Sequence, residues 1–232
     1  MEYWHSLGSL KTTNTALKLQ NPRDFVLLSL NVLELIITWG NCEDSTKVTP
    51  PFLFIDTERL NRAFIVKGNQ IVSFAFPFSI YSRVDDDGKH LFCVNYRDIV
   101  LSPEIISKAM SFAKSLDLDK SSYAAQVQGV DFRDSSMKSA IRLFEQILSL
   151  EPSYIRYDYD KQSSNGTMHP LYHFDVNYNK NYTYKIGLYR NLEVSKMREV
   201  LDQNSDSWYT KPYSLISKIE QIIVEKWKEK KS

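Results

Sequence analysis

Cysteine is scarce in this sequence: only two occur among 232 residues, Cys42 and Cys93, and they lie far apart. They form no CxxC pair, so neither a disulfide-rich scaffold nor a cysteine zinc site is expected. Glycine and proline are also few, with 7 and 8 residues, which argues against long flexible linkers. This cysteine usage fits a reducing compartment, and we therefore expect a cytoplasmic protein.

Neither sign of charge is in excess, because 29 basic residues face 28 acidic ones and the net charge is +1. A broad basic surface with general affinity for nucleic acid is therefore not predicted. No signal peptide is expected at the N-terminus, which lacks a basic region followed by an apolar one. The most apolar run, residues 25–39, contains Asn31 and Glu34 and is about five residues shorter than a membrane span. We expect a buried helix there, and no membrane partner.

The sequence lacks the common loop motifs that bind nucleotide phosphates or present a nucleophile for acyl transfer. The sequence contains no GxxxxGK[ST], no GxGxxG and no GxSxG, so a phosphate-binding loop and a nucleophile elbow are not expected. Zinc-finger, basic-zipper and RNP patterns are absent as well. The stretch Asp85-Asp86-Asp87-Gly88 lacks the distal glutamate of an EF-hand, and it predicts a solvated turn.

Hydrophobic periodicity of both kinds is present. Helices are predicted over residues 22–39, starting at the Asn21-Pro22 cap, 103–115, 135–150, 194–201 and 212–228. Hairpins are predicted for residues 62–76 and 78–96. This order predicts an α+β fold with a mostly antiparallel sheet built from hairpins and flanked by about five helices. We expect a single domain over 1–232, with a candidate subdivision near 130–150.

Reactive side chains concentrate in residues 153–190, where two runs alternate with the period of a strand. The first run directs Ile155, Tyr157 and Tyr159 to one face, and Arg156, Asp158 and Asp160 to the other. The second directs Tyr172, Phe174, Val176 and Tyr178 to one face, and His173, Asp175 and Asn177 to the other. If both runs lie in one sheet, a polar face collects an arginine, a histidine, an asparagine and up to three carboxylates.

Three interpretations of this polar face stay open. In one, Asp158, Asp160, His173 and Asp175 bind Mg²⁺ or Mn²⁺, the hard cations that oxygen ligands prefer. In another, the catalytic residues are Arg156, Asp158, His173 and Asp175: an aspartate orients His173 as general base, and Arg156 or Lys185 binds an anion. In the third, the same groups form a structural ion network. A helical zinc motif is not expected, because Pro170 separates His169 from His173.

The segments LFEQILSLEPSYIRYDYD, NGTMHPLYHFDVNY and TYKIGLYR resemble the signature of an uncharacterised family of bacterial proteins. In that signature a Glu-Pro-Ser-Tyr step is followed by an R-x-D-Y-D strand and by H-P-L-x-H-x-D. The resemblance covers about residues 140–205, and the earlier half agrees only in its layout of a helix followed by hairpins. The matching residues are Arg156, Asp158, Asp160, His169, His173 and Asp175. The resemblance implies an association with restriction or phage-defence loci, and it implies no role for any of these residues.

Two functions follow as hypotheses, and whether the chain is an enzyme stays open. The first is a non-catalytic interaction subunit of a multi-component bacterial anti-phage defence system. Its partner would be an ATPase or a nuclease, and nucleic acid would be reached through that complex. The alternative is a metal-dependent or acid–base phosphodiester hydrolase, a nuclease-type effector that uses the Arg/Asp/His cluster of residues 156–175. Carboxylate oxygens converging within about 5 Å in an open pocket would favour a metal. A sealed, mutually hydrogen-bonded cluster would favour the scaffold.

Overall fold

The computed structural model describes residues 2–7, 19–39, 43, 46–84, 86, 90–116, 123, 127, 132–166, 168–178 and 182–205. The chain divides into two compact units, Met1–Val194 and Ser195–Ser232, and each is described by itself. The single domain with a subdivision near 130–150 stays a prediction. The predicted helix over 212–228 lies outside the described residues, as does the 85–89 turn apart from Asp86.

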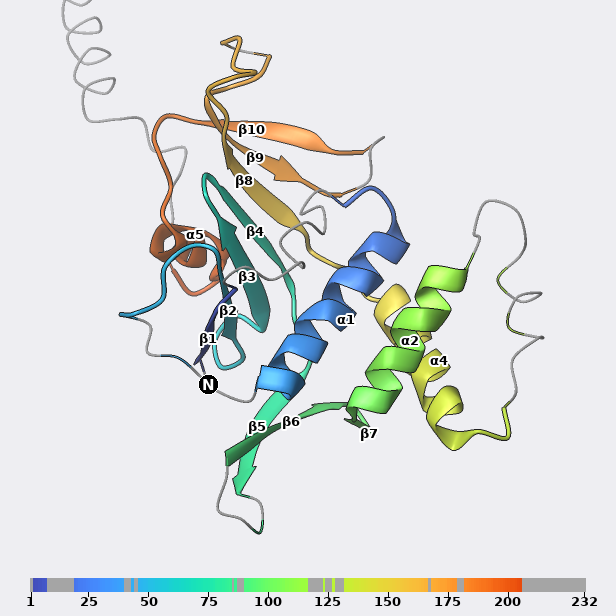
Figure 1. Cartoon of the computed structure of the whole chain (residues 1–232). Helices are drawn as coiled ribbons and strands as arrows, with labels where there is room; N and C mark the ends of the chain where they lie inside the picture. Colours follow the sequence, from blue (N-terminus) through green and yellow to red (C-terminus); the bar gives the residue numbers. More distant parts are fainter. Residues whose placement is uncertain are drawn as a thin grey trace, which may run out of the picture. The chain divides into compact units, whose positions relative to one another are not determined.

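Seven strands of the first unit form one sheet, here called sheet A, in the order β1-β2-β3-β4-β8-β9-β10 (Figure 1). Its strands are β1 Glu2–Ser6, β2 Phe52–Asp56, β3 Arg62–Lys67, β4 Gln70–Ala75, β8 Ile155–Tyr159, β9 Tyr172–Val176 and β10 Tyr184–Leu188. Sheet B holds β5 Ser79–Val84, β6 His90–Tyr96 and β7 Ile99–Leu101. All pairings between these strands are antiparallel, so the predicted α+β class with a mostly antiparallel sheet is confirmed.

The described residues contain four helices: α1 Pro22–Trp39, α2 Pro103–Ser115, α4 Ser135–Leu148 and α5 Val194–Leu201. Each was predicted, although α4 ends two residues earlier than expected. Polar side chains cap the N-termini of α1 and α2 by accepting hydrogen bonds from first-turn amides that have no partner within the helix. Asn21 Oδ1 accepts from the Asp24 amide at 3.0 Å, and Ser102 Oγ accepts from the Ile105 amide at 3.3 Å.

Both predicted hairpins are present, β3–β4 around Gly68-Asn69 and β5–β6. Strands β1, β2 and β7 were not predicted. All five residues of β2 are buried, because both faces of the sheet are covered at this strand. Its sequence therefore lacks the alternation by which a half-exposed strand is recognised. Strand β7 has only three residues, too few to show a period.

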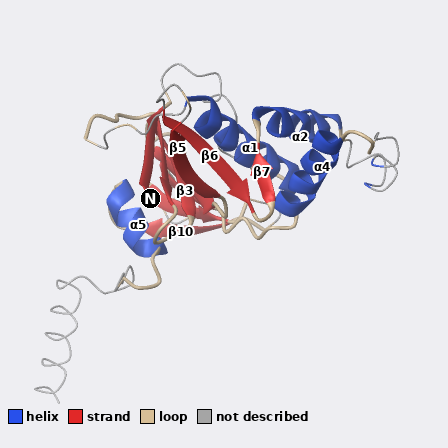
Figure 2. Cartoon of the chain, turned by 90° about the horizontal axis from the view of Figure 1, so that it is seen from below, coloured by secondary structure: helices blue, strands red, loops and turns tan. Residues whose placement is uncertain are grey.

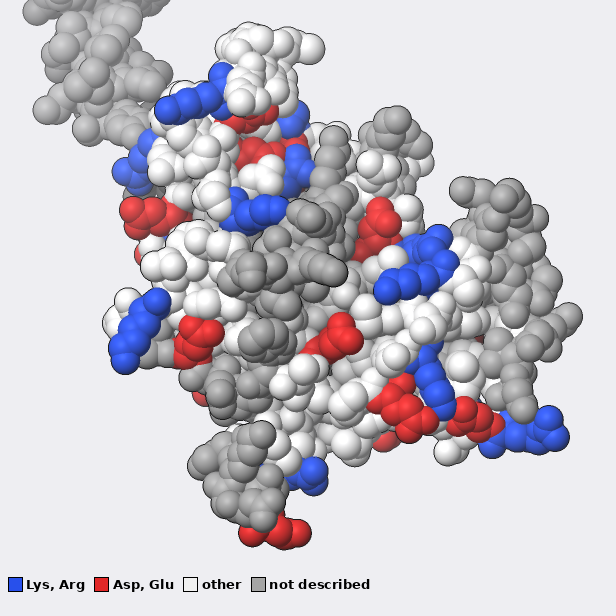
Figure 3. Space-filling view, viewed as in Figure 1, with Lys and Arg blue, Asp and Glu red and all other residues white. Residues whose placement is uncertain are grey.

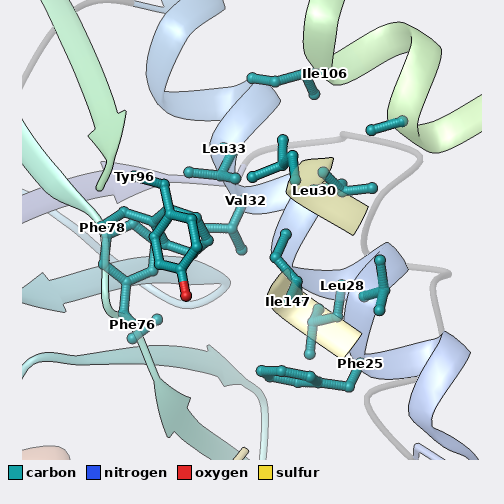
Figure 4. Packing of buried hydrophobic residues seen from close by; sticks show 14 of the residues in the cluster. Phe25, Leu28, Leu30, Val32, Leu33, Phe76, Phe78, Tyr96, Ile106 and Ile147 are labelled. Atoms are coloured by element: carbon teal, nitrogen blue, oxygen red, sulfur yellow. The ribbon is translucent and has the colours of Figure 1, made fainter. Parts of the chain in front are cut away.

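Helices α1, α2 and α4 lie together beside the strands of the first unit (Figure 2). The face of sheet A that contributes Leu53, Ile65, Val72 and Phe74 to the core is called the helical face here. Phe25 of α1 packs edge-on against Phe74, with ring centroids 5.9 Å apart. The same core continues to sheet B, where the aromatic rings of residues 76, 78 and 96 pack close to α1 (Figure 4).

The apolar run of residues 25–39 is part of α1, and most of its side chains are buried in this core, as predicted. Glu34 lies on the exposed side of the helix. Among the described residues, no helix combines the length and the hydropathy that crossing a membrane would require.

Candidate functional site

Strands β8 and β9 bring four predicted site residues together. Their register places Arg156 opposite Asp175, and Asp158 opposite His173. Residues opposite each other in an antiparallel ladder share a face, so the four side chains project to one side, as predicted. This side is the helical face, because Val72 of β4 lies opposite Arg156 and belongs to the core beneath α1.

The neighbouring strands each add a polar side chain to this group. Strand β10 places Lys185 opposite Asp175, and β4 places Gln70 opposite Asp158. Lys185 was named from the sequence as an alternative anion-binding residue, and the register places it on the same face as the four. Gln70 was missed, because it lies in a hairpin 88 residues before Asp158 and no local pattern links the two.

All four carboxylate oxygens of the two aspartates receive a hydrogen bond. Arg156 Nε donates to Asp158 Oδ2 at 2.8 Å, and Gln70 Nε2 donates to Asp158 Oδ1 at 2.9 Å. An amino group of Arg156 donates to Asp175 Oδ2 and lies 2.7 Å from Asp158 Oδ2. Lys185 Nζ donates to Asp175 Oδ1 at 2.6 Å. Burial would lower the pKa of Arg156, but its hydrogen bond to Asp158 and the charge of that carboxylate outweigh burial and raise it.

The two neighbours of His173 determine its protonation. Its Nδ1 lies 2.8 Å from the carbonyl oxygen of Pro170, which can only accept, so Nδ1 carries a proton. Its Nε2 lies 2.9 Å from the ammonium of Lys185, which can only donate, so Nε2 accepts. In this arrangement Nε2 faces Lys185 and also lies 3.7 Å from Asp158 Oδ2 and 3.9 Å from Asp175 Oδ1.

Charge is balanced within this group, called the charge cluster here: Arg156, Asp158, His173, Asp175 and Lys185. Two carboxylates face one guanidinium and one ammonium. The side chains of the first four residues are at most 10% exposed, whereas that of Lys185 is 32% exposed. The cluster is thus closed except on the side of Lys185.

Asp160, which was expected among the metal ligands, is not brought into the cluster. It follows the last residue of β8 and accepts the backbone amides of Gln162 at 3.0 Å and Ser163 at 2.9 Å. The hydrogen bond from the Ser163 amide is the main cause that lowers the pKa of Asp160. Its carboxylate also lies 3.2 Å from Nε2 of His169. Asn177, with φ of 68°, has left the extended conformation at the end of β9.

A divalent cation could be held by three members of the charge cluster. One ligand atom each from Asp158, His173 and Asp175 lies within 4.8 Å of the others. Lys185 Nζ already contacts two of these residues, so a metal ion would have to displace it. General-base catalysis by His173 meets the same obstacle, because Lys185 occupies the lone pair of Nε2. Lys185 therefore stands in the way of both chemistries, and Arg156 bonds the same two carboxylates.

A cavity of about 340 Å³ lies on the other face of sheet A. Ile71, Tyr157 and the segment 191–194 contribute to its walls. Tyr157 holds this segment in place, donating to Asn191 Oδ1 at 2.6 Å and accepting from the Leu192 amide at 3.2 Å. Side chains along a strand alternate between faces, so the cavity gives no route to the charge cluster.

Surface charge in the described residues is mixed. On the face shown in Figure 3, lysine and arginine side chains are interspersed with aspartate and glutamate, including over the region of β8 to β10.

Comparison with protein-family models, curated proteins and solved structures found no match for this chain. The resemblance over residues 140–205 therefore rests on its motif alone, and family membership stays a prediction.

Proposed function

We propose that this chain is a non-catalytic interaction subunit of a multi-component bacterial anti-phage defence system, acting in the cytoplasm with an ATPase or a nuclease as its partner. The saturation of the charge cluster is the observation that supports this most. Each carboxylate oxygen has a donor, and the lone pair of His173 is occupied by Lys185. An acid–base catalyst needs a group free to exchange a proton with its substrate. The defence context comes from the motif resemblance.

The cluster serves to fasten strands that would otherwise be weakly held. Lys185 is the member contributed by β10, and it connects this strand to His173 and Asp175 of β9. Strand β10 has little else to hold its side chains, since four of its five residues are exposed. The cluster thus keeps the end of sheet A in one defined geometry.

The end of sheet A exposes the side chains that a protein partner would contact. Tyr182, Tyr184, Ile186 and Tyr189 are between 45% and 79% exposed, and they form the β10 patch. Exposed apolar patches mark protein interfaces, and aromatic side chains are enriched there relative to the rest of the surface. We therefore place the docking surface for the larger partner here.

The test separates the β10 patch from the charge cluster. The double variant Tyr182→Ser/Tyr189→Ser should stay folded but lose both co-purification with the neighbouring gene products and protection against phage. Tyr81→Ser removes an exposed tyrosine from β5 and is the matched control, which should retain both. In His173→Gln, co-purification with the partner should decrease only to the extent that the variant is less stably folded. Loss of protection in His173→Gln, with unchanged melting temperature and unchanged co-purification, would contradict the proposal and indicate catalysis.

One observation favours a second candidate, a metal-dependent or acid–base phosphodiester hydrolase. The potential ligand atoms of Asp158, His173 and Asp175 converge within 4.8 Å. In this function they would hold Mg²⁺ or Mn²⁺ once Lys185 had moved away, and the metal would polarise a phosphodiester. Calorimetric titration with Mn²⁺ and a cleavage assay on DNA and RNA test it. Binding and cleavage that both disappear in His173→Gln would support the hydrolase.

A further inference from the structure

Strand β10 is an edge strand that lacks the usual protection against pairing. It is hydrogen-bonded to β9 on one side, and no described strand pairs with its other side. Natural edge strands are commonly protected by prolines, bulges or outward-pointing charges, above all lysine. The pairing of β10 with β9 is continuous over all five residues, and the strand contains no proline.

The only charged residue of β10 does not protect this edge. Lys185 directs its ammonium back to β9, where it bonds Asp175 Oδ1 at 2.6 Å and His173 Nε2 at 2.9 Å. Tyr184 and Ile186 are exposed on the opposite face of the strand. The edge therefore offers backbone hydrogen-bonding groups flanked by apolar side chains, which is the chemistry that accepts an additional β-strand.

The sequence of β10 is complementary to itself in antiparallel pairing. With the two-fold axis at Ile186, this residue lies opposite Ile186 of the partner subunit, and Tyr184 lies opposite Leu188 of the partner subunit. Lys185 then lies opposite Gly187 of the partner subunit, so no two ammonium groups face each other. A two-fold axis at Lys185 would place like charges directly opposite, which destabilises a sheet. The charge of Lys185 thus excludes an axis at this residue, and the axis at Ile186 keeps all five residues of β10 paired.

We infer that a second copy of this chain pairs with β10, so that two copies of sheet A join in a symmetric dimer. This inference rests on the proposed function, because it names a partner for the same end of the sheet. The pairing uses the backbone edge and leaves the exposed faces of Tyr184 and Ile186 uncovered. The β10 patches of the two copies therefore become one larger apolar surface, which is the surface offered to the ATPase or nuclease.

Light scattering coupled to size-exclusion chromatography of the full-length protein tests the dimer. The molar mass measured for the wild type should be twice the 27.1 kDa of one chain. Ile186→Lys places two charges opposite each other at the axis and should weaken association about tenfold or more. Val100→Lys, which adds the same charge to an exposed position of β7, is the control and should remain dimeric. A wild type that stays monomeric up to high micromolar concentration would overturn the inference.

Cysteine crosslinking tests the register without a disruptive charge. In a background with Cys42→Ser and Cys93→Ser, Ile186→Cys should form an intermolecular disulfide under mild oxidation, because residue 186 meets its own copy. Tyr184→Cys lies on the same face of the same strand but meets residue 188, and it should not crosslink. The reverse pattern would overturn this pairing.

A monomer that still co-purifies with its partner through Tyr182 and Tyr189 would overturn the dimer but leave the proposed function intact. A crosslinked dimer that binds no partner would support the dimer and overturn the proposed function.

Discussion

The helical face of sheet A is buried in two different ways at its two ends. On β2 to β4 it is covered by apolar packing, with residues such as Leu53, Ile65 and Phe74 beneath α1. On β8 and β9 the positions with the same orientation carry the charge cluster, which is buried to a similar degree. Apolar burial stabilises each residue by the area it removes from water, about 25 cal/mol per Å². Charged burial is tolerated only while every charge has its partner.

This difference teaches that the cost of truncating a side chain should have a different origin at the two ends. In the apolar end, truncation removes the contacts of the side chain and leaves a cavity that its neighbours fill only in part. In the charged end, truncation also leaves its former partners buried without compensation. The predictions below use this contrast, beginning with the largest effect.

Asp175→Ala should be the most damaging single substitution in the charge cluster. It removes one of the two acceptors of Arg156 and one of the two of Lys185, and the guanidinium remains buried with Asp158 as its single carboxylate partner in the cluster. We expect the free energy of unfolding to fall by about 3–5 kcal/mol, measured by urea denaturation. Asp175→Asn keeps the shape without the charge and should lie between this variant and the wild type. A loss below about 1 kcal/mol would show that the cluster does not hold the sheet together.

Lys185→Met should lower the free energy of unfolding by less than Asp175→Ala does, although it also removes a charge from the cluster. The side chain of Lys185 is 32% exposed, so water can reach part of the space that the ammonium leaves. Asp175 Oδ1 and His173 Nε2 lose a donor, and we expect a loss of about 1–2 kcal/mol in the same denaturation experiment. The variant also opens access to the three potential metal ligands. Mn²⁺ that stabilised this variant but not the wild type would show that the ammonium blocks a cation site.

Ile65→Val tests the apolar end with the smallest practical truncation. One methylene is removed from a position where the core beneath α1 surrounds the side chain. We expect a loss of about 1 kcal/mol in the free energy of unfolding. A loss as large as that of Asp175→Ala would remove the contrast between the two ends of the sheet.

Asp160→Asn should have the smallest effect, and a pH-dependent one. The Ser163 amide lowers the pKa of Asp160 in the folded protein below its ordinary value of 3.8. The stability that this carboxylate contributes is therefore present above the ordinary pKa and is lost as the pH falls through the lower folded value. The melting temperatures of the variant and the wild type should differ at pH 7 and converge as the pH falls below 3.8 and through the lower folded pKa. A difference that did not change with pH would exclude this role.

Local patterns predicted the four described helices, the two hairpins and one face of the site, but not strands β1, β2 and β7. Asn21-Pro22 indicated where α1 begins, and the alternation around Arg156 and Asp175 indicated that these residues share a face. Patterns within one segment could not show which strands become neighbours. Gln70 reaches Asp158 because β4 pairs with β8, although sheet B, α2 and α4 come between these two strands in the sequence. Asp160 was grouped with the cluster by alternation alone, but the chain turns where β8 ends.

The amino-acid sequence by itself determined that strands near residues 156, 173 and 185 would each carry charge on one side, because side chains alternate along any strand. Only the tertiary structure decided that these charges neutralise one another. Strand register sets distances between groups that lie far apart along the chain, and ion pairs depend on those distances. The same register leaves β10 at the end of sheet A, with its lysine turned toward β9 and with no strand of the described residues on its other side.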